Sequence, residues 1–325
     1  MGLDPTTEPS EHDGATARAR IAVVGSYNLD TALELAAFPV PGETVIARGA
    51  RKSHGGKGSN QAVQAARCGG MVSLIACVGN DAAGRAALDF WRMEGMAVYS
   101  TLQHKDLPTG TATILVDRSG ENLIVVNPGA NLALTPDTVL QGLAALHPLP
   151  AILVAQLETS VEVAQAAFRW AREAHATTIL NAAPVKAPLT PALIDLTDIL
   201  VINEIEALAL VGSSPGASDA LAAARRLASQ VGIAVVLTRG AAGATLFGSR
   251  HDAFQVPSPP AQVRDTTGAG DAFIGAFAAQ YAANASLEDA VKWGVAAGSF
   301  ACRGQGAVPS YGTREEIGAS FGDLV

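Results

Sequence analysis

From residue 20 onward, short runs of β-branched and other apolar residues alternate with longer Ala-rich stretches whose apolar positions recur every three or four residues. The first pattern is typical of buried strands and the second of amphipathic helices. Strands are predicted at 21–25, 72–77, 151–155, 177–180, 198–202 and 234–238. Helices are predicted from Lys57 to the glycines at 69 and 70, and at 161–175, 219–232 and 271–285. This alternation predicts an α/β fold with a doubly wound, mainly parallel sheet flanked by helices and joined by right-handed crossovers.

Two segments depart from this rhythm and predict a small lid. Residues 111–117 and 121–127 are apolar runs on either side of an Asp-Arg-Ser-Gly turn, which is the pattern of a β-hairpin. Residues 38–54 contain prolines and alternating residues but no helical period. We therefore expect a β lid, formed by about 38–54 and 109–127, on an α/β core spanning 20–325. Such a lid commonly closes on substrate. Residues 1–19 are expected to be a disordered tail.

The composition excludes several classes of function. The chain has 325 residues and a formal net charge of -8, and its aromatic content is only 5%. Nucleic acids and anionic membranes recruit clustered Lys and Arg, and single strands also recruit aromatic platforms, so neither is an expected partner. No uncharged apolar run reaches the roughly 18 residues that cross a bilayer. Three cysteines without CxxC spacing favour a reducing compartment, so we expect a cytoplasmic protein.

The strongest chemical signal is the heptapeptide DTTGAGD at 265–271, directly before a strongly helical stretch. Glycines at a helix start let backbone N–H groups converge on an anion, aided by the helix dipole. A carboxylate in the first turn, Asp271, can accept a proton from a substrate hydroxyl while the amides stabilise a transferring phosphoryl group. The alternative is an ordinary glycine loop with an acidic residue favouring the dipole. Complete Walker A and GxGxxG motifs are both absent.

Three further polar clusters stand at strand ends or helix starts. Asn28 and Asp30 follow the first strand and can offer donors and acceptors to a polyol, although turns after strands use the same residues. The glycine-rich segment 54–61 places Asn60 one turn inside a helix, where backbone can approach a small ligand closely. Asn203 and Glu206 can hold Mg²⁺ through waters, or form a helix N-cap with a Glu at N3.

These residues together resemble the PfkB-type carbohydrate kinases of the ribokinase-like fold, from residue 20 to about 320. The resemblance rests on ten segments in the family's order: GSYNLD, FPVPGETV, GGKGSNQA, PTGTA, GENLIVVNPGAN, QLE, NAAP, NEIEA, DTTGAGDAF and GAVPS. It implies ATP-dependent phosphorylation of a sugar, with the 5-hydroxyl of D-ribose as the first expectation.

The resemblance also implies a role for each matching residue. Asp271 is the expected base, with an anion hole made by the amides of Gly268, Ala269 and Gly270. The expected sugar ligands are Asn28, Asp30, Gly56, Lys57, Asn60, Glu158 and Asp271. ATP is expected to contact Asn203, Thr238, Gly240, Gly243 and Gly270, and Mg²⁺ to lie near Asn203 and Glu206. An activating K⁺ is expected near Asp265, Thr267, Ala301, Gly304, Gly306 and Ser310. Family enzymes are often homodimers joined through the lid sheets.

The chain departs from the family pattern at three positions. Tyr27 replaces a small aliphatic residue, and its side chain would reshape the sugar pocket if it faced that pocket. Arg239 stands where the family usually has an apolar or small residue, and it either contacts phosphate or points to solvent. Ile202 replaces a proline. Three alternatives to a ribose kinase stay open. The first is a PfkB-type kinase for deoxyribose, a hexose or a nucleoside. The second is a noncatalytic sugar or nucleotide sensor, and the third is a nicotinamide-dependent oxidoreductase. A sensor should have lost the base or a glycine of the anion hole, and the sequence retains both.

Overall fold

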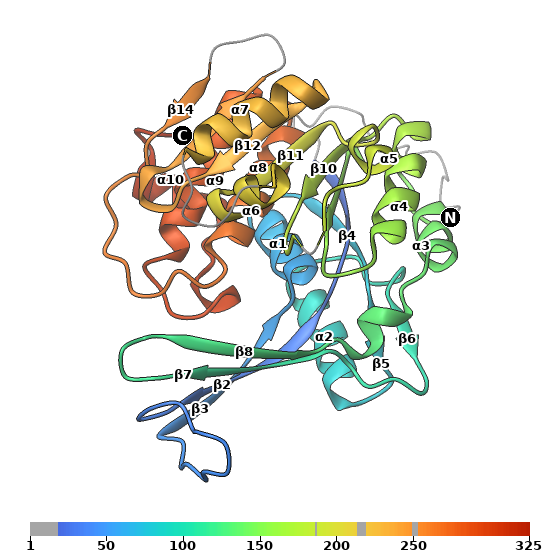
Figure 1. The fold of residues 1–325 in the computed structure, drawn as a ribbon. Helices are drawn as coiled ribbons and strands as arrows, with labels where there is room; N and C mark the ends of the chain where they lie inside the picture. The colour runs from blue at the N-terminus through green and yellow to red at the C-terminus, as the bar shows by residue number, and fades with distance from the viewer. Residues whose placement is uncertain (1–18, 186, 213–218, 249–252) are drawn as a thin grey trace, which may run out of the picture.

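The computed structural model describes residues 19–185, 187–212, 219–248 and 253–325, so most of the expected tail lies outside the described residues. An eight-stranded sheet forms the centre, in the order β14-β13-β12-β11-β10-β9-β1-β4 (Figure 1). Its strands are β1 (Arg20–Val24), β4 (Met71–Ile75), β9 (Ile152–Gln156), β10 (Thr177–Asn181), β11 (Ile199–Asn203), β12 (Ala234–Thr238), β13 (Ala244–Phe247) and β14 (Phe254–Val256).

The six strands from β4 to β12 pair in parallel, and β13 and β14 add an antiparallel edge. The predicted α/β class with a mainly parallel sheet is confirmed. The strand predicted at 72–77 is present as β4 but ends two residues earlier, because the chain leaves the central sheet after Ile75. There the carbonyl of Ala76 accepts a hydrogen bond from Leu102 (2.9 Å), and β5 (Cys77–Gly79) pairs with β6 (Leu102–His104) in a separate two-stranded sheet.

Alternate residues of each strand face opposite layers, since side chains along a strand point to opposite faces. Val23 and Val154 belong to one buried cluster, whereas Val24 and Ala155 belong to the other. The first cluster is covered by α1 (Lys57–Arg67), α2 (Ala82–Met93), α8 (Ala269–Ala282), α9 (Leu287–Ala301) and α10 (Arg314–Phe321). The second is covered by α3 (Pro136–Ala144), α4 (Val161–Glu173), α5 (Pro191–Ile194), α6 (Glu204–Leu210) and α7 (Ala220–Val231). Short 3₁₀ turns are η1 (Gly129–Ala133), η2 (Gly240–Ala242) and η3 (Val308–Ser310).

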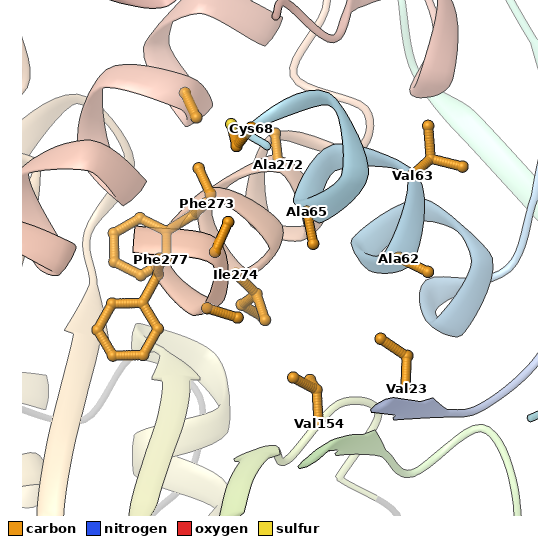
Figure 2. Packing of buried hydrophobic residues seen from close by; sticks show 14 of the residues in the cluster. Val23, Ala62, Val63, Ala65, Cys68, Val154, Ala272, Phe273, Ile274 and Phe277 are labelled. Carbon is orange, nitrogen blue, oxygen red and sulfur yellow. The ribbon is translucent and has the colours of Figure 1, made fainter. Parts of the chain in front are cut away.

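Helices α1 and α8 pack against each other over Val23 and Val154 of the sheet (Figure 2). Their close approach depends on Gly275, where a Cβ atom would lie 2.5 Å from the carbonyl oxygen of Gln61. This contact brings the first turns of the two helices together, and with them the glycine-rich segment before α1 and the DTTGAGD loop before α8.

The small sheet projects from one end of the core, in the order β3-β2-β7-β8 (Figure 1). Its strands are β2 (Asn28–Glu34), β3 (Gly49–Gly55), β7 (Thr111–Val116) and β8 (Asn122–Asn127). The β7–β8 pairing is the hairpin that the turn predicted. Of the segment 38–54, only the part from 49 onward is strand, and the first strand of this sheet is β2, which lies nearer the N-terminus than the sequence pattern indicated. Among the described residues, no helix has the length and apolar character of a membrane span.

Candidate active site

The expected site residues come from several loops at the carboxyl ends of the parallel strands. Asn28 follows β1, Glu158 follows β9, Asn203 ends β11 and Thr238 ends β12. The strand order reverses between β1 and β9, because β4 lies on one side of β1 and β9 on the other. Open α/β sheets bind ligands outside the carboxyl ends of strands at such a reversal.

The loop before α8 has the geometry of an anion site. Gly268 is the N-cap, with a left-handed φ of 77°, and a Cβ there would lie 2.6 Å from the Cβ of Ala307, so only glycine fits. Nothing lies within 4 Å of a Cβ placed on Gly270, so the backbone is open to a ligand at that point. The N–H of Ala269 donates to the carbonyl of Thr266 at 3.2 Å, so this amide is already engaged.

Asp271 stands in the first turn of α8 and is 7% exposed. Its Oδ2 accepts a hydrogen bond from Asn60 Nδ2 (3.0 Å), and its Oδ1 accepts one from Gln61 Nε2 (2.9 Å). The charge of Asp271 raises the pKa of Lys57, and the charges of Glu158 and Glu206 add smaller increases. The three carboxylates together outweigh burial, which lowers this pKa. The ammonium group of Lys57 therefore belongs to a cluster of carboxylates.

A polar corner next to Asp271 contains the expected sugar ligands. Glu158 accepts hydrogen bonds from the hydroxyl of Ser26 and from the amide of Lys57 (2.8 Å), which ties the loop after β9 to the start of α1. Burial, with added repulsion from Glu158 and Asp271, raises the pKa of Asp30 to about 7. Such a shift arises where a carboxyl group loses water and faces other negative charges.

Two acceptors in this corner have no hydrogen-bond partner within the described part of the chain: Oδ1 of Asp30 and Oδ1 of Asn60, both buried. Buried polar atoms are almost always paired, so unpaired acceptors near Lys57 and Asp271, which line the smaller cavity described below, suit a ligand that donates hydrogen bonds. Asn28 lies in the same corner and accepts from Asn131 Nδ2 (3.0 Å). Hydroxyl groups of a polyol are suitable donors to such acceptors.

Two cavities adjoin this corner and meet at Thr238 and Gly270, which line both. The smaller has a volume of about 210 Å³ and is polar, and the larger has a volume of about 640 Å³ and is mainly apolar. Polar side chains and loop backbone of the smaller cavity come from Lys57, Asn181, Asn203, Glu206, Thr238, Gly268, Gly270 and Asp271. Gly240 and Gly243 line the larger one. A phosphate chain in the first and a purine in the second would match the shape and polarity of both.

Asn203 and Glu206 form a capping box in which each side chain accepts from the other's backbone amide at 2.8 Å. Both also line the smaller cavity, so the capping box leaves them next to the space that a ligand would occupy. Burial raises the pKa of Glu206, although the amide of Asn203 and the charge of Lys57 oppose it. Within the described ranges, no cluster of three or more His, Cys, Asp or Glu side chains could hold a metal alone.

The residues expected around a monovalent cation also lie close together. Asp265 accepts from the amide and hydroxyl of Thr267 (2.9 and 2.6 Å) and from the amide of Gly306 (2.7 Å). Burial alone would raise the pKa of Asp265, but these hydrogen bonds outweigh it and lower the pKa. A Cβ on Gly304 would lie 2.4 Å from that of Ser310, and Gly304 donates to the carbonyl of Ala301 (3.1 Å). The arrangement can present a carboxylate and hydroxyls to a cation.

The two departures near the site, Tyr27 and Arg239, each contact another side chain of the protein. Tyr27 is fully buried, its ring stands edge-on to Trp91, and its hydroxyl is 2.7 Å from Nδ1 of His54. Burial lowers the pKa of His54, so a neutral ring can accept this hydrogen bond. The phenol is therefore not presented to a sugar. Arg239 Nε lies 3.6 Å from a carboxylate oxygen of Glu204, the first residue of α6, so the two side chains form a charge pair.

Sequence reasoning assigned no role to several residues that contact the site. Gln61, Gln156 and Asn181 form hydrogen bonds beneath Asp271, and Asn131 supports Asn28. Each lies within a segment that carried the family resemblance, namely GGKGSNQA, QLE, NAAP and GENLIVVNPGAN. Their presence in these segments was the available signal, but nothing local showed what they contact.

A carboxylate at a glycine-bordered helix start, unpaired acceptors beside it and two adjoining cavities define a small-molecule phosphotransferase. Comparison with known families agrees, since residues 18–314 match the model of the pfkB family carbohydrate kinases. The chain belongs to this family.

Two curated relatives are ribokinases or contain one. A bifunctional ribokinase/ribose-5-phosphate isomerase A of Fructilactobacillus sanfranciscensis is 37% identical over 300 residues, which cover 92% of this chain and 55% of that longer protein. The ribokinase of Mus musculus is 32% identical over 303 residues, covering 92% of this chain and 94% of the relative.

Solved structures show the same fold. The ribokinase of Arabidopsis thaliana, determined with ribose and ATP, has a TM-score of 0.83 and 27% identity over 93% of this chain and 98% of its own. Phosphofructokinase-2 of Escherichia coli, determined with potassium, has a TM-score of 0.77 and 26% identity over 94% and 99%.

Proposed function

We propose that the protein is an ATP-dependent ribokinase that transfers the γ-phosphoryl group of ATP to the 5-hydroxyl of D-ribose and releases D-ribose 5-phosphate. The observation that carries the proposal is the pair of unpaired buried acceptors on Asp30 and Asn60. Asn60 donates to the Asp271 carboxylate, and the charge of that carboxylate acts on Asp30. A polyol supplies donors to both acceptors and a hydroxyl to the base. The names of the curated relatives support ribose as the sugar.

In the proposed reaction, Asp271 accepts the proton of the sugar hydroxyl as its oxygen attacks the γ-phosphorus in line. The amides of Gly268 and Gly270 stabilise charge on the transferring group, and that of Ala269 joins them by leaving the carbonyl of Thr266. The ammonium of Lys57 neutralises charge between the sugar and the phosphates. Closure of the lid sheet keeps water out, so that ATP is not hydrolysed.

Sugar orientation is assigned to the polar corner. Asn28 and Asp30 on β2 contact the sugar hydroxyls together with Asn60, Glu158 and the backbone at Gly56. Because Asn28 and Asp30 stand on a strand of the small sheet, movement of that sheet changes both sugar binding and access of water. This arrangement couples substrate binding to closure.

The nucleotide and its ions are assigned to the two cavities. The phosphates lie in the polar cavity near Thr238 and Gly270, with the base toward Gly240 and Gly243 in the apolar one. Bound Mg²⁺ would lie near Asn203 and Glu206 and would neutralise charge on the β- and γ-phosphates. We further propose that K⁺ binds beside Asp265 and Thr267, bounded by the loop that contains Ala301, Gly304, Gly306 and Ser310.

The small sheet is also our proposed dimer interface. Four consecutive residues of β8 expose large apolar side chains: Leu123, Ile124, Val125 and Val126, from 50% to 67% exposed. A second copy of the lid sheet would cover them. We place the enzyme in the cytoplasm, because its three free cysteines and its need for ATP suit that compartment.

The test measures ATP consumption with Mg²⁺ and K⁺ across ribose, deoxyribose, fructose, a nucleoside and no sugar. Ribose-dependent turnover well above the others is expected. Preference for another sugar would keep the mechanism and change the substrate, whereas no turnover with any of them would favour a sensor.

Asp271→Asn keeps the side-chain shape but cannot take the proton. We expect it to lower kcat by about 10²–10⁴-fold while ribose binding by calorimetry persists. The matched control is Asp289→Asn, since Asp289 occupies the same position in the first turn of α9 but is exposed. It should leave turnover unchanged. An Asp271→Asn enzyme with turnover close to that of the wild type would remove the base assignment.

A further inference from the structure

We propose that Gln61 is a positioning residue for Asp271, and that Gln156 and Asn181 fix the orientation of its side-chain amide. The inference rests on the proposed role of Asp271 as the base. Three residues to which the sequence assigned no role, Gln61, Gln156 and Asn181, form a connected set of hydrogen bonds next to that carboxylate.

Two consecutive residues of α1 hold the two oxygens of Asp271. Gln61 Nε2 donates to Oδ1 at 2.9 Å, and Asn60 Nδ2 donates to Oδ2 at 3.0 Å. One donor on each oxygen restrains rotation of the carboxylate plane and still leaves a lone pair on each oxygen. A base held in this way keeps a free lone pair directed toward the substrate hydroxyl.

The amide of Gln61 can donate to both Asp271 and Asn181 in one orientation only. Its Nε2 donates both to Asp271 and to Oδ1 of Asn181 (3.1 Å), while its Oε1 accepts from Gln156 Nε2 (2.7 Å). Turning the amide over would face its oxygen toward these two acceptors. Gln156 adds to the preference through the donor that it presents, although its own Oε1 has no hydrogen-bond partner among the described residues. Asn181 is held in turn by donating to the carbonyl of Val201 at 3.2 Å.

Burial makes this orientation preference strong. Gln61 and Gln156 are each 1% exposed and Asn181 is 6% exposed, so water cannot replace a lost partner. The four side chains come from four elements: α1, β9, β10 and α8. Hydrogen bonds to a charged group are stronger than neutral ones, and Asp271 is the charged member of this set. The N–H groups of Gln156 and Gln61 therefore both donate toward the base, whereas Asn181 donates to Val201.

Gln156 offers the cleanest test, because it acts only through Gln61 and is not among the residues that line either cavity. Gln156→Met removes the donor but leaves Asp271 and Asn181 to orient Gln61, so kcat should fall only a few-fold. Gln156→Glu places an acceptor there and favours the reversed amide, with its oxygen against Asp271. We expect kcat to fall about 10- to 100-fold, because small misplacements of reacting groups cause losses of this size. The ATP KM should be unchanged.

A double-mutant cycle separates positioning from packing. Gln61→Met should itself lower kcat about 10- to 100-fold, and adding Gln156→Glu to it should lower kcat no further, because the side chain that transmits the change is gone. A merely structural role predicts that the two losses multiply. Ribose calorimetry verifies that each variant is folded. If Gln156→Glu does not fold, Gln61→Met and Gln156→Met decide the matter.

The outcomes distinguish this inference from the proposed function. Absence of sugar-dependent turnover in the wild type would overturn the proposed function itself, whereas full activity of Asp271→Asn would remove the base assignment on which this inference rests. A normal wild type and an inactive Asp271→Asn, combined with Gln61→Met turning over within about two-fold of wild type, would overturn the positioning role alone.

Discussion

Asp30 provides a prediction in which stability and function oppose each other. Burial, reinforced by the charges of Glu158 and Asp271, raises its pKa from 3.8 to about 7. A carboxyl group held in such surroundings costs free energy whenever it is ionised. Asp30→Asn keeps the shape and removes the charge, so it should stabilise the ligand-free protein while weakening sugar binding.

The magnitude follows from linkage. A rise of about three pH units corresponds to about 4 kcal/mol at most, at about 1.36 kcal/mol per unit. Asp30 is only partly buried and neighbouring water screens its charge, so we expect about 2 kcal/mol. Between pH 4 and 7 the folded protein retains a proton on Asp30 that the unfolded chain has released. The free energy of unfolding of the wild type therefore falls across this interval, relative to Asp30→Asn, and the difference is constant above it.

Urea unfolding of both ligand-free proteins at pH 5, 6, 7 and 8 measures this difference. It should grow by about 1 to 3 kcal/mol from pH 5 to 8 in favour of Asp30→Asn, while kcat/KM for ribose falls at least about ten-fold. The control is Asp117→Asn in the exposed β7–β8 turn. The pKa of Asp117 is lowered by the Ser119 hydroxyl, so both states are ionised throughout this range. A pH-independent difference at Asp30, or a less stable Asp30→Asn at pH 8, would refute the reasoning.

Three further predictions concern the cation, the buried phenol and the lid. Replacing K⁺ by Na⁺ should lower kcat, and Asp265→Asn should abolish the difference between the two salts; an equal rate for the wild type in both would remove the cation site. Tyr27→Phe should cost about 1–3 kcal/mol in urea unfolding, since His54 loses its partner, yet leave the ribose KM within about two-fold. A ten-fold KM change would place Tyr27 in the sugar site after all. Ile124→Glu should convert the proposed dimer into a monomer in sedimentation, and an unchanged mass would exclude this face as the interface.

The parts of the fold that followed local periodicity could be predicted from the sequence. The runs at 21–25, 151–155 and 234–238 are buried on both faces, which parallel strands between two helical layers require. β2 could not be found in this way, because NLDTALE has few of the β-branched and aromatic residues that favour strands. It is strand because β3 and β7 pair with it on both edges, and those partners lie about 20 and 80 residues away in the chain.

The site residues also fall into two groups, those that the local sequence reveals and those whose contacts depend on distant residues. Asp271, Asn203 and Glu206 are recognisable locally, since the glycines and the capping box lie within a few residues of them. What Tyr27 faces depends instead on His54 and Trp91, and no spacing rule states whether a residue next to Asn28 points to the sugar or to the core.

The orientation of the proposed base depends even more on distant residues. Oδ1 of Asp271 is restrained by Gln61, 210 residues earlier, and that amide is directed by Gln156, 95 residues further along. A motif can therefore supply the reacting group, while the direction in which it acts is set by polar side chains that only the folded sheet brings together. Substitutions at positions such as 156 and 181 should consequently change turnover without altering any recognisable motif around Asp271, and comparison of the 265–271 segment alone would not detect them.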